Sequence, residues 1–258
     1  MIDSQIKTCC ESIKLSFTEV YDVKLDEKGV KLFKFKISDY VNLLPELKVL
    51  LNTSEIERAQ RYYHQKDSNR FIVCRGLLKL ILAKEIGVDV SRIELSKDAN
   101  KKPFLAFCPE LHFNVSHAEN YALIALGVQE LGVDVEYLSK DFNFIEVLPT
   151  VFSAPEISVV LTAENKNKTF YKLWTRKEAI VKATGKGIDD NLVEIDVLDE
   201  AEYIEASAFQ SKQHMQVFSF DVDQDYIGAL AFKKGRVDVD NIRLYPLDTL
   251  LKDFKRQI

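Results

Sequence analysis

The chain has 258 residues, of which 47% are hydrophobic and 29% are charged, a composition typical of a soluble globular protein. Its 35 basic and 40 acidic side chains give a formal net charge of −5, which argues against a nucleic-acid binder. We expect a cytoplasmic protein, because the N-terminus lacks a secretory-signal pattern and no apolar run reaches the roughly 18 residues of a membrane span. The four cysteines form no C-x-x-C pair, which favours reduced thiols over a disulfide framework or a zinc site.

The first third of the chain predicts two strands followed by a helical region. Residues 13–23 and 30–37 have strand character, and the second stretch alternates apolar and basic residues as a half-buried strand does. Ser54 and Glu57 have the spacing of a capping box, so we expect a helix to begin there. Apolar residues then recur at helical spacing until Gly87, a natural stop.

The middle of the chain returns to strands before a second helix. Residues 113–117 predict a strand, and residues 121–127 and 131–138 predict a hairpin. Ser153 and Glu156 form a further capping-box pair, with a proline in the first turn between them, so a helix is expected to start there.

The last third predicts one more helix and then strands only. The helix comprises residues 169–185 and ends at Gly185. The strands that follow are expected at residues 192–198, 202–209, 215–222, 226–232 and 242–247. Strands and helices in this order indicate an α+β fold.

Two carboxylates stand two residues apart in the predicted strand 131–138. Side chains at this spacing project from the same face of a strand, so Asp134 and Glu136 point the same way. A solvated strand face is the commoner explanation for an isolated Asp-x-Glu. Convergent carboxylates are also how proteins hold a hard divalent cation, together with water and substrate phosphate oxygens.

The predicted helix 169–185 carries three charged residues of interest. Glu178 and Lys182 are four residues apart along the edge of its apolar stripe. They form either a surface ion pair or part of the same site as Asp134 and Glu136. Lys177 projects from the middle of that stripe. It is either a lysine whose stem is buried and whose head reaches water, or a buried cation at a phosphate site.

Ser116 and His117 are adjacent in a predicted strand and should face opposite sides of it. They are therefore not expected to form a nucleophile–base pair, and His117 is better suited to binding an anion. The other histidines, for which we expect structural roles, are His64, His112 and His214.

The segments "FNVSH", "GVDVE" and "WTRKEAIVKATGKG" occur in that order and together resemble the Sfp-type (surfactin-synthetase-activating) group of the 4′-phosphopantetheinyl transferase superfamily. The likeness covers roughly residues 30–198. It implies a pseudo-dimer of two similar α+β halves with coenzyme A in the cleft between them. We expect an N-terminal extension over residues 1–29, packed on the first half, and halves at residues 30–127 and 128–258.

The resemblance also implies a set of site residues. Asp134, Glu136 and Glu178 would together hold one Mg2+ ion, or Mn2+ in its place, and the whole hypothesis depends on these three carboxylates meeting. Glu178 would act as the base and Lys182 would stabilise developing charge. The residues that would contact coenzyme A are Arg58, Arg70, Lys102, Ser116, His117 and Lys182. This chain departs from the family pattern at Lys101, often glycine, and at Glu55, where some relatives carry a basic residue.

The implied reaction moves the 4′-phosphopantetheine arm of coenzyme A to a serine of an apo acyl or peptidyl carrier protein and releases adenosine 3′,5′-bisphosphate. The duplicated architecture favours a monomer. A carrier is typically acidic around its serine, so the expected docking residues are Lys172, Arg176 and Lys186. The alternatives are a regulatory relative that binds coenzyme A or a carrier without catalysis, and a metal-dependent phosphodiesterase or nuclease. The sequence leaves the natural carrier and its pathway open.

Overall fold

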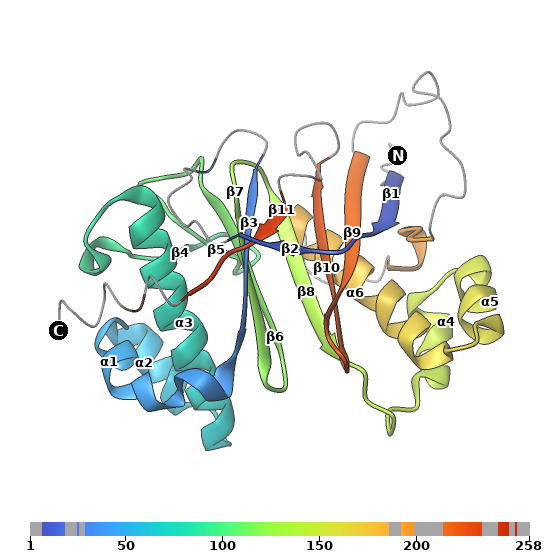
Figure 1. Cartoon of the computed structure of the whole chain (residues 1–258), viewed down its shortest axis with the longest axis horizontal. Helices are drawn as coiled ribbons and strands as arrows, with labels where there is room; N and C mark the ends of the chain where they lie inside the picture. Colours follow the sequence, from blue (N-terminus) through green and yellow to red (C-terminus); the bar gives the residue numbers. More distant parts are fainter. Residues whose placement is uncertain are drawn as a thin grey trace.

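The computed structural model describes residues 7–18, 25, 29–185, 192–198, 214–233, 242–247 and 251. Two mixed sheets face each other, and each is covered by helices on its outer side (Figure 1). A buried apolar layer joins the inner faces of the sheets, with Leu123 and Val133 among its members. Among the described residues, no helix has the length and apolar character needed to cross a bilayer. The α+β architecture with two halves agrees with the sequence prediction.

The first sheet has the strand order β2-β11-β3-β7-β6, and the helices α1 to α3 cover its outer face. The strands of this half are β2 (Ser16–Phe17), β3 (Val30–Lys36), β6 (His112–Ala118), β7 (Tyr121–Gly127) and β11 (Ile242–Leu244). A separate two-stranded sheet joins β4 (Ser96–Lys97) and β5 (Pro103–Phe104). The helices are α1 (Leu44–Val49), α2 (Thr53–Gln60) and α3 (Gln65–Ile86), with short 3-10 helices η1 (Ile37–Leu43) and η2 (Val90–Arg92).

The second sheet has the order β1-β9-β10-β8, and α6 packs across β8 and β10. Its strands are β1 (Lys7–Ser12), β8 (Leu131–Tyr137), β9 (His214–Asp223) and β10 (Tyr226–Lys233). The helices of this half are α4 (Leu148–Val151), α5 (Ala154–Thr162) and α6 (Lys166–Thr184), with 3-10 helices η3 (Phe144–Glu146) and η4 (Leu192–Glu194).

Most of the predicted helix ends are confirmed. α3 stops at Gly87 and α6 stops at Gly185, and both glycines are left-handed, with φ of +76° and +66°. The capping box of α5 at Ser153 is also present. The capping box predicted at Ser54 is wrong by two residues. Asn52 is the extended residue before α2, so its side chain, rather than that of Ser54, accepts the backbone N–H three residues later.

The predicted hairpin of residues 121–138 is wrong, although its strands are present. β7 pairs with β3 and β6 in the first sheet, whereas β8 pairs with β10 in the second. Every residue of β7 is buried, so its sequence shows no alternation that would identify its neighbour. The chain therefore crosses from one sheet to the other at residues 128–130.

The strand predicted at residues 192–198 is also wrong, because this segment forms η4 followed by a loop. Its backbone groups are paired with buried side chains instead of a neighbouring strand. Lys177 donates to the carbonyl oxygens of Leu192 and Ile195, and the N–H of Val197 donates to Glu156. The predicted strand at residues 202–209 lies outside the described residues.

The two halves exchange strands at the ends of the chain. β1, from the N-terminal extension, runs parallel to β9 in the second sheet, whereas β11, from the C-terminal half, runs parallel to β3 in the first. The other strand of the extension, β2, pairs with β11 in the first sheet. Each sheet is completed by a segment from the other end of the sequence (Figure 1).

Candidate active site

Three elements bring their polar side chains together between the halves: β6, β8 and α6. The Nζ atom of Lys182 lies 2.6 Å from Oδ1 of Asp134 and 3.0 Å from Oγ of Ser116. The Ser116 hydroxyl donates to the same Asp134 oxygen at 2.8 Å. Ser116 also accepts a hydrogen bond from the backbone N–H of Val135 at 3.3 Å, which ties β6 to β8. The strand carboxylate and the helix lysine singled out by the sequence thus form one cluster.

A glycine allows this contact. A Cβ atom on Gly132 would lie 2.1 Å from the carbonyl oxygen of Ala179 and 2.3 Å from the backbone nitrogen of Ala183. The backbone of α6 therefore rests directly on β8, and only glycine permits that approach. Asp134 follows two residues later on the same face of the strand, which sets its carboxylate against Lys182.

Glu136 and Glu178 lie beside this cluster, and the charges of Asp134 and Lys182 affect the pKa values of both. The indole N–H of Trp174 donates to Oε1 of Glu136 at 3.3 Å. Burial, followed by the charge of Asp134, raises the pKa of Glu136 to about 7 against the opposing effects of Trp174 and Lys182. Burial and Asp134 raise the pKa of Glu178 as well. The three carboxylates are close enough to repel one another.

Two buried carboxylate oxygens at this site, Oδ2 of Asp134 and Oε1 of Glu178, have no hydrogen-bond partner. Unpaired anionic oxygens that repel one another have the donor chemistry a hard cation requires. Among the described residues, however, no three side chains of metal-binding types are gathered so that they could hold an ion. The three carboxylates expected to share one ion are therefore not gathered closely enough in this structure to hold it together.

A second group of charges lies on the other side of β6. Desolvation lowers the pKa of His117, and the charges of Arg70 and Lys182 lower it further. Arg70 is paired with Asp67 at 2.7 Å. Ser116 faces Asp134 while His117 lies in the field of Arg70, so the two adjacent side chains serve different groups, as strand geometry predicts.

Arg58 and Glu55 lie on α2. The guanidinium of Arg58 stacks over the ring of Phe71, 4.9 Å from its centroid. Glu55 is buried and pairs with Lys79 at 2.8 Å. It also closes the capping box of α2. Its role here is structural, because it starts the helix and neutralises a buried lysine.

Comparison with known proteins identifies the family to which the chain belongs. A family model described as "4'-phosphopantetheinyl transferase superfamily" matches residues 130–231, and one described as "4'-phosphopantetheinyl transferase, N-terminal" matches residues 42–129. The 4'-phosphopantetheinyl transferase HetI of Nostoc is 35% identical over 166 residues, covering 62% of this chain and 70% of the relative. The chain belongs to the 4′-phosphopantetheinyl transferase superfamily.

Other members of the superfamily match similar stretches. A putative 4'-phosphopantetheinyl transferase of Synechocystis, slr0495, is 33% identical over 59% of this chain and 64% of its own length. The 4'-phosphopantetheinyl transferase Sfp of Bacillus subtilis is 31% identical over 51% of this chain and 59% of its own length. The matches thus span about three fifths to seven tenths of these relatives.

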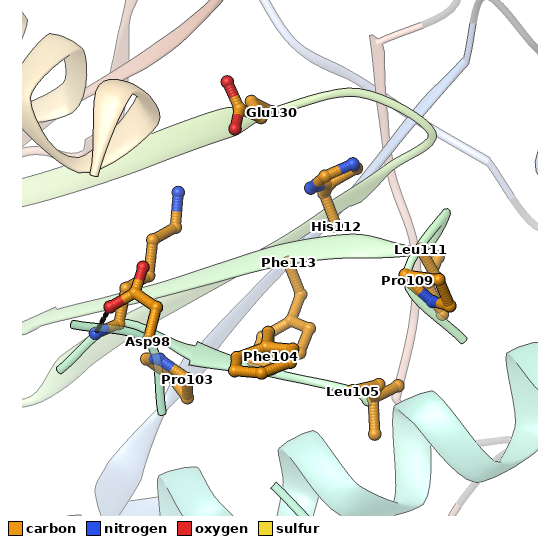
Figure 2. Close-up of a pocket in the computed structure, with 10 residues that line it drawn as sticks. Asp98, Pro103, Phe104, Leu105, Pro109, Leu111, His112, Phe113 and Glu130 are labelled. Atoms are coloured by element: carbon orange, nitrogen blue, oxygen red, sulfur yellow. Dashed lines mark hydrogen bonds between the residues drawn. The ribbon is translucent and has the colours of Figure 1, made fainter. Parts of the chain in front are cut away.

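In this member of the superfamily, the Lys102 side chain lies against the last turn of α6. Its ammonium group donates to the backbone carbonyl oxygens of Leu131, Lys182 and Ala183. Next to it opens a cavity of about 260 Å³, with Phe104 and Phe113 on its apolar side and His112 and Glu130 opposite them (Figure 2). Of the predicted site residues, only Lys102 lines this cavity.

Two basic residues of α6 have roles that the sequence did not predict. Arg176 is fully buried, where Nε donates to Oγ of Ser219 at 2.7 Å and NH1 donates to the carbonyl oxygen of Val197 at 2.7 Å. The prediction that it contacts a carrier protein is therefore wrong. Of the other expected docking residues, Lys172 is half-buried and Lys186 lies outside the described residues.

Lys177 is fully buried as well, and neither interpretation of it is right. Its ammonium group lies 2.8 Å from Oε2 of Glu156, which is equally buried, so it reaches neither water nor a phosphate site. It holds the loop after α6 through the carbonyl oxygens of Leu192 and Ile195. A charged side chain in an apolar stripe indicates burial against a partner, but the partner lies 21 residues away in the sequence.

The sequence analysis missed Gly132 and the polar role of Trp174. A lone glycine inside a strand is a signal for close backbone approach, so Gly132 could have been found. The ring of Trp174 packs against the core of the second half, as expected for an apolar residue of this helix. Its N–H reaches Glu136, and nothing in the periodicity of α6 indicates this partner.

Proposed function

We propose that the protein transfers the 4′-phosphopantetheine arm of coenzyme A to a serine of an apo acyl or peptidyl carrier protein. The observation that carries this proposal is the contact between Lys182, Asp134 and Ser116, beside two carboxylate oxygens without partners. Family membership supports it, because relatives matched here are named as 4'-phosphopantetheinyl transferases. A cytoplasmic monomer with halves at residues 30–127 and 128–258 is part of the same proposal.

The reaction is a phosphoryl-type transfer in which the serine oxygen of the carrier attacks the β-phosphorus of the coenzyme A pyrophosphate. The bond from that phosphorus to the bridging oxygen breaks, and adenosine 3′,5′-bisphosphate leaves with the electron pair. The carboxylate of Glu178 accepts the serine proton, directly or through water. Positioning and charge neutralisation dominate such transfers, and Lys182 supplies a cation for the leaving phosphate.

Asp134, Glu136 and Glu178 are the residues that would hold Mg2+, with Mn2+ as an alternative. Mg2+ usually takes one or two carboxylates and fills its other positions with water and phosphate oxygens, which suits a site where three ligands are not already gathered. The ion, when bound, would neutralise the pyrophosphate and orient the leaving group. The unpaired oxygens of Asp134 and Glu178 support this assignment.

Coenzyme A would lie over Ser116 and extend toward the basic residues of the first half. Ser116 and Lys182 face the pyrophosphate position in this proposal. His117 and Arg70 form the next positive group, and their mutual repulsion is what a bound phosphate would relieve. Arg58, stacked on Phe71 in the same half, is the third cation proposed to contact the phosphates.

Mass spectrometry of several apo carrier proteins incubated with the protein, coenzyme A and Mg2+ tests the proposal. We expect each substrate carrier to gain the mass of one phosphopantetheine group. Asp134→Asn should abolish the gain, whereas Asp141→Asn, a matched change at an exposed aspartate, should leave it intact. Binding of coenzyme A without modification of any carrier would indicate the regulatory alternative. Release of acid-soluble nucleotides from DNA or RNA would indicate the nuclease.

A further inference from the structure

The loop between β4 and β5 is held in a defined shape by its first residue. Oδ1 of Asp98 accepts the backbone N–H groups of Asn100 at 2.9 Å and Lys102 at 2.8 Å. The N–H of Lys101 donates to the carbonyl oxygen of Asp98 at 3.0 Å, with Lys101 in the left-handed region at φ +66°. The loop therefore presents the Lys102 side chain from a fixed backbone.

This loop of the first half contacts the end of α6 in the second half. Nζ of Lys102 lies 2.6 Å from the carbonyl oxygen of Lys182, 3.3 Å from that of Leu131 and 3.4 Å from that of Ala183. The side-chain amide of Asn100 donates to the carbonyl oxygen of Gly185. The last carbonyl groups of a helix lack partners within it, and a cation there also complements the helix dipole.

The contacts of Lys102 account for all the hydrogen atoms on its ammonium group. A lysine has three N–H donors, and three carbonyl oxygens accept from this one. A phosphate contact, which the family resemblance suggests for this residue, would require one of these bonds to break. Burial also lowers its pKa, while Glu130 and Asp98 oppose that effect.

Lys182 is held at both of its ends. Its backbone carbonyl accepts from Lys102 at 2.6 Å, and its own ammonium group donates to Asp134 at 2.6 Å. The adjacent turn of α6 rests on Gly132 with no room for a methyl group. A shift of the helix end would therefore break the Lys102 contact and move the Lys182 ammonium away from Asp134.

We propose that Lys102 is a positioning residue that fixes the last turn of α6 and thereby places the Lys182 ammonium beside Asp134 and Ser116. It acts through the helix backbone, from the opposite half of the molecule, and does not itself contact the pyrophosphate. This inference rests on the proposed transferase function for its kinetic consequence. Its structural consequence, an anchored helix end, is independent of that function.

The test compares Lys102→Met with Lys101→Met, which removes the same charge from the exposed neighbouring side chain. For Lys102→Met we expect kcat of carrier modification to fall about tenfold to a hundredfold, as for a displaced catalytic group. The dissociation constant of coenzyme A, measured by calorimetry, should stay within about twofold of wild type. Amide hydrogen exchange in residues 181–185 should become faster, and Lys101→Met should change none of these quantities.

Lys102→Arg should restore much of kcat, because a guanidinium also donates to carbonyl oxygens. If Lys102→Met does not fold, Asn100→Ala serves instead, with the same signs and smaller effects. Weaker coenzyme A binding at unchanged kcat would overturn the inference in favour of a phosphate contact, and unchanged exchange at the helix end would also overturn it. Absence of transfer by the wild-type protein would count against the proposed function alone, since the exchange measurement still tests the anchor.

Discussion

Replacing Gly132 with alanine tests how the site is assembled. The new methyl group would lie 2.1 Å from the carbonyl oxygen of Ala179, and non-bonded Cβ–oxygen contacts do not fall below 3.0 Å, so α6 must recede by at least about 0.9 Å. The 2.6 Å bond between Lys182 and Asp134 would lengthen beyond hydrogen-bond distance. Overpacking costs about 3 kcal/mol, and the reduced entropy of the unfolded chain returns about 1, for a net loss near 2 kcal/mol.

The free energy of unfolding from urea titration measures the first effect, and kcat of carrier modification measures the second. Misplacing a catalytic group by about 1 Å should lower kcat by about a hundredfold. Gly127→Ala is the matched control, because its methyl group would clash only with the end of the Leu131 side chain, which can rotate away, and would make ordinary contacts with its other neighbours. If Gly132→Ala keeps a free energy of unfolding within about 0.5 kcal/mol of wild type and an unchanged kcat, the idea that the close approach of α6 to β8 positions the site is refuted.

The remaining predictions concern charge. Lys177→Met should lower the free energy of unfolding by about 3–5 kcal/mol, because it leaves Glu156 buried without its cation, and an unchanged urea midpoint would contradict this. In EDTA, the wild-type protein should lose stability as pH rises from about 4.5 to 7, because folded Glu136, with its raised pKa, binds a proton that the unfolded chain has released. Glu136→Gln should make that slope shallower, since Glu178 with its raised pKa still contributes, and should be about 2 kcal/mol more stable at pH 8 after allowance for partial solvent screening; parallel pH profiles would count against the argument. Coenzyme A should bind less tightly as pH rises through the pKa of His117. The charges of Arg70 and Lys182 lower this pKa, and the negative charge of a bound phosphate would raise it, so binding favours the protonated ring. Calorimetry should show proton uptake that His117→Gln abolishes, and equal uptake by the variant would exclude this histidine.

Helix ends were predictable from sequence because their causes are local. Gly87 and Gly185 adopt left-handed backbone that glycine accepts without strain, and the Ser153 capping box satisfies groups within one turn. Strand partners were not predictable in this way. β7 and β8 are separated by a short turn typical of a hairpin, yet they belong to different sheets. Both strands are almost wholly buried, so the hydrophobic pattern of each fits more than one partner strand and does not identify the right one.

The site was predictable in its residue types more than in its contacts. Strand parity placed Asp134 and Glu136 on one face, and helical spacing placed Glu178 near Lys182. That Lys182 reaches Asp134 depends on how α6 lies on β8, which is a tertiary property. The same limit explains the wrong expectation for Arg176. Whether a cation on α6 faces a docking partner or a buried group depends on segments far away in the sequence, here the strand β9 that carries Ser219.

The exchange of β1 and β11 between the sheets makes the molecule a poor candidate for dissection. A cut at residues 128–130 separates the sequence where the chain passes between sheets, but each fragment then carries away a strand that the other needs. These strands are β1, at the edge of the second sheet, and β11, between β2 and β3 in the first. Neither piece could complete its own sheet, and each would expose unpaired backbone groups along an open border. Produced together, the two fragments should therefore associate and restore both sheets, because β1 of one fragment pairs with β9 of the other and β11 pairs with β3.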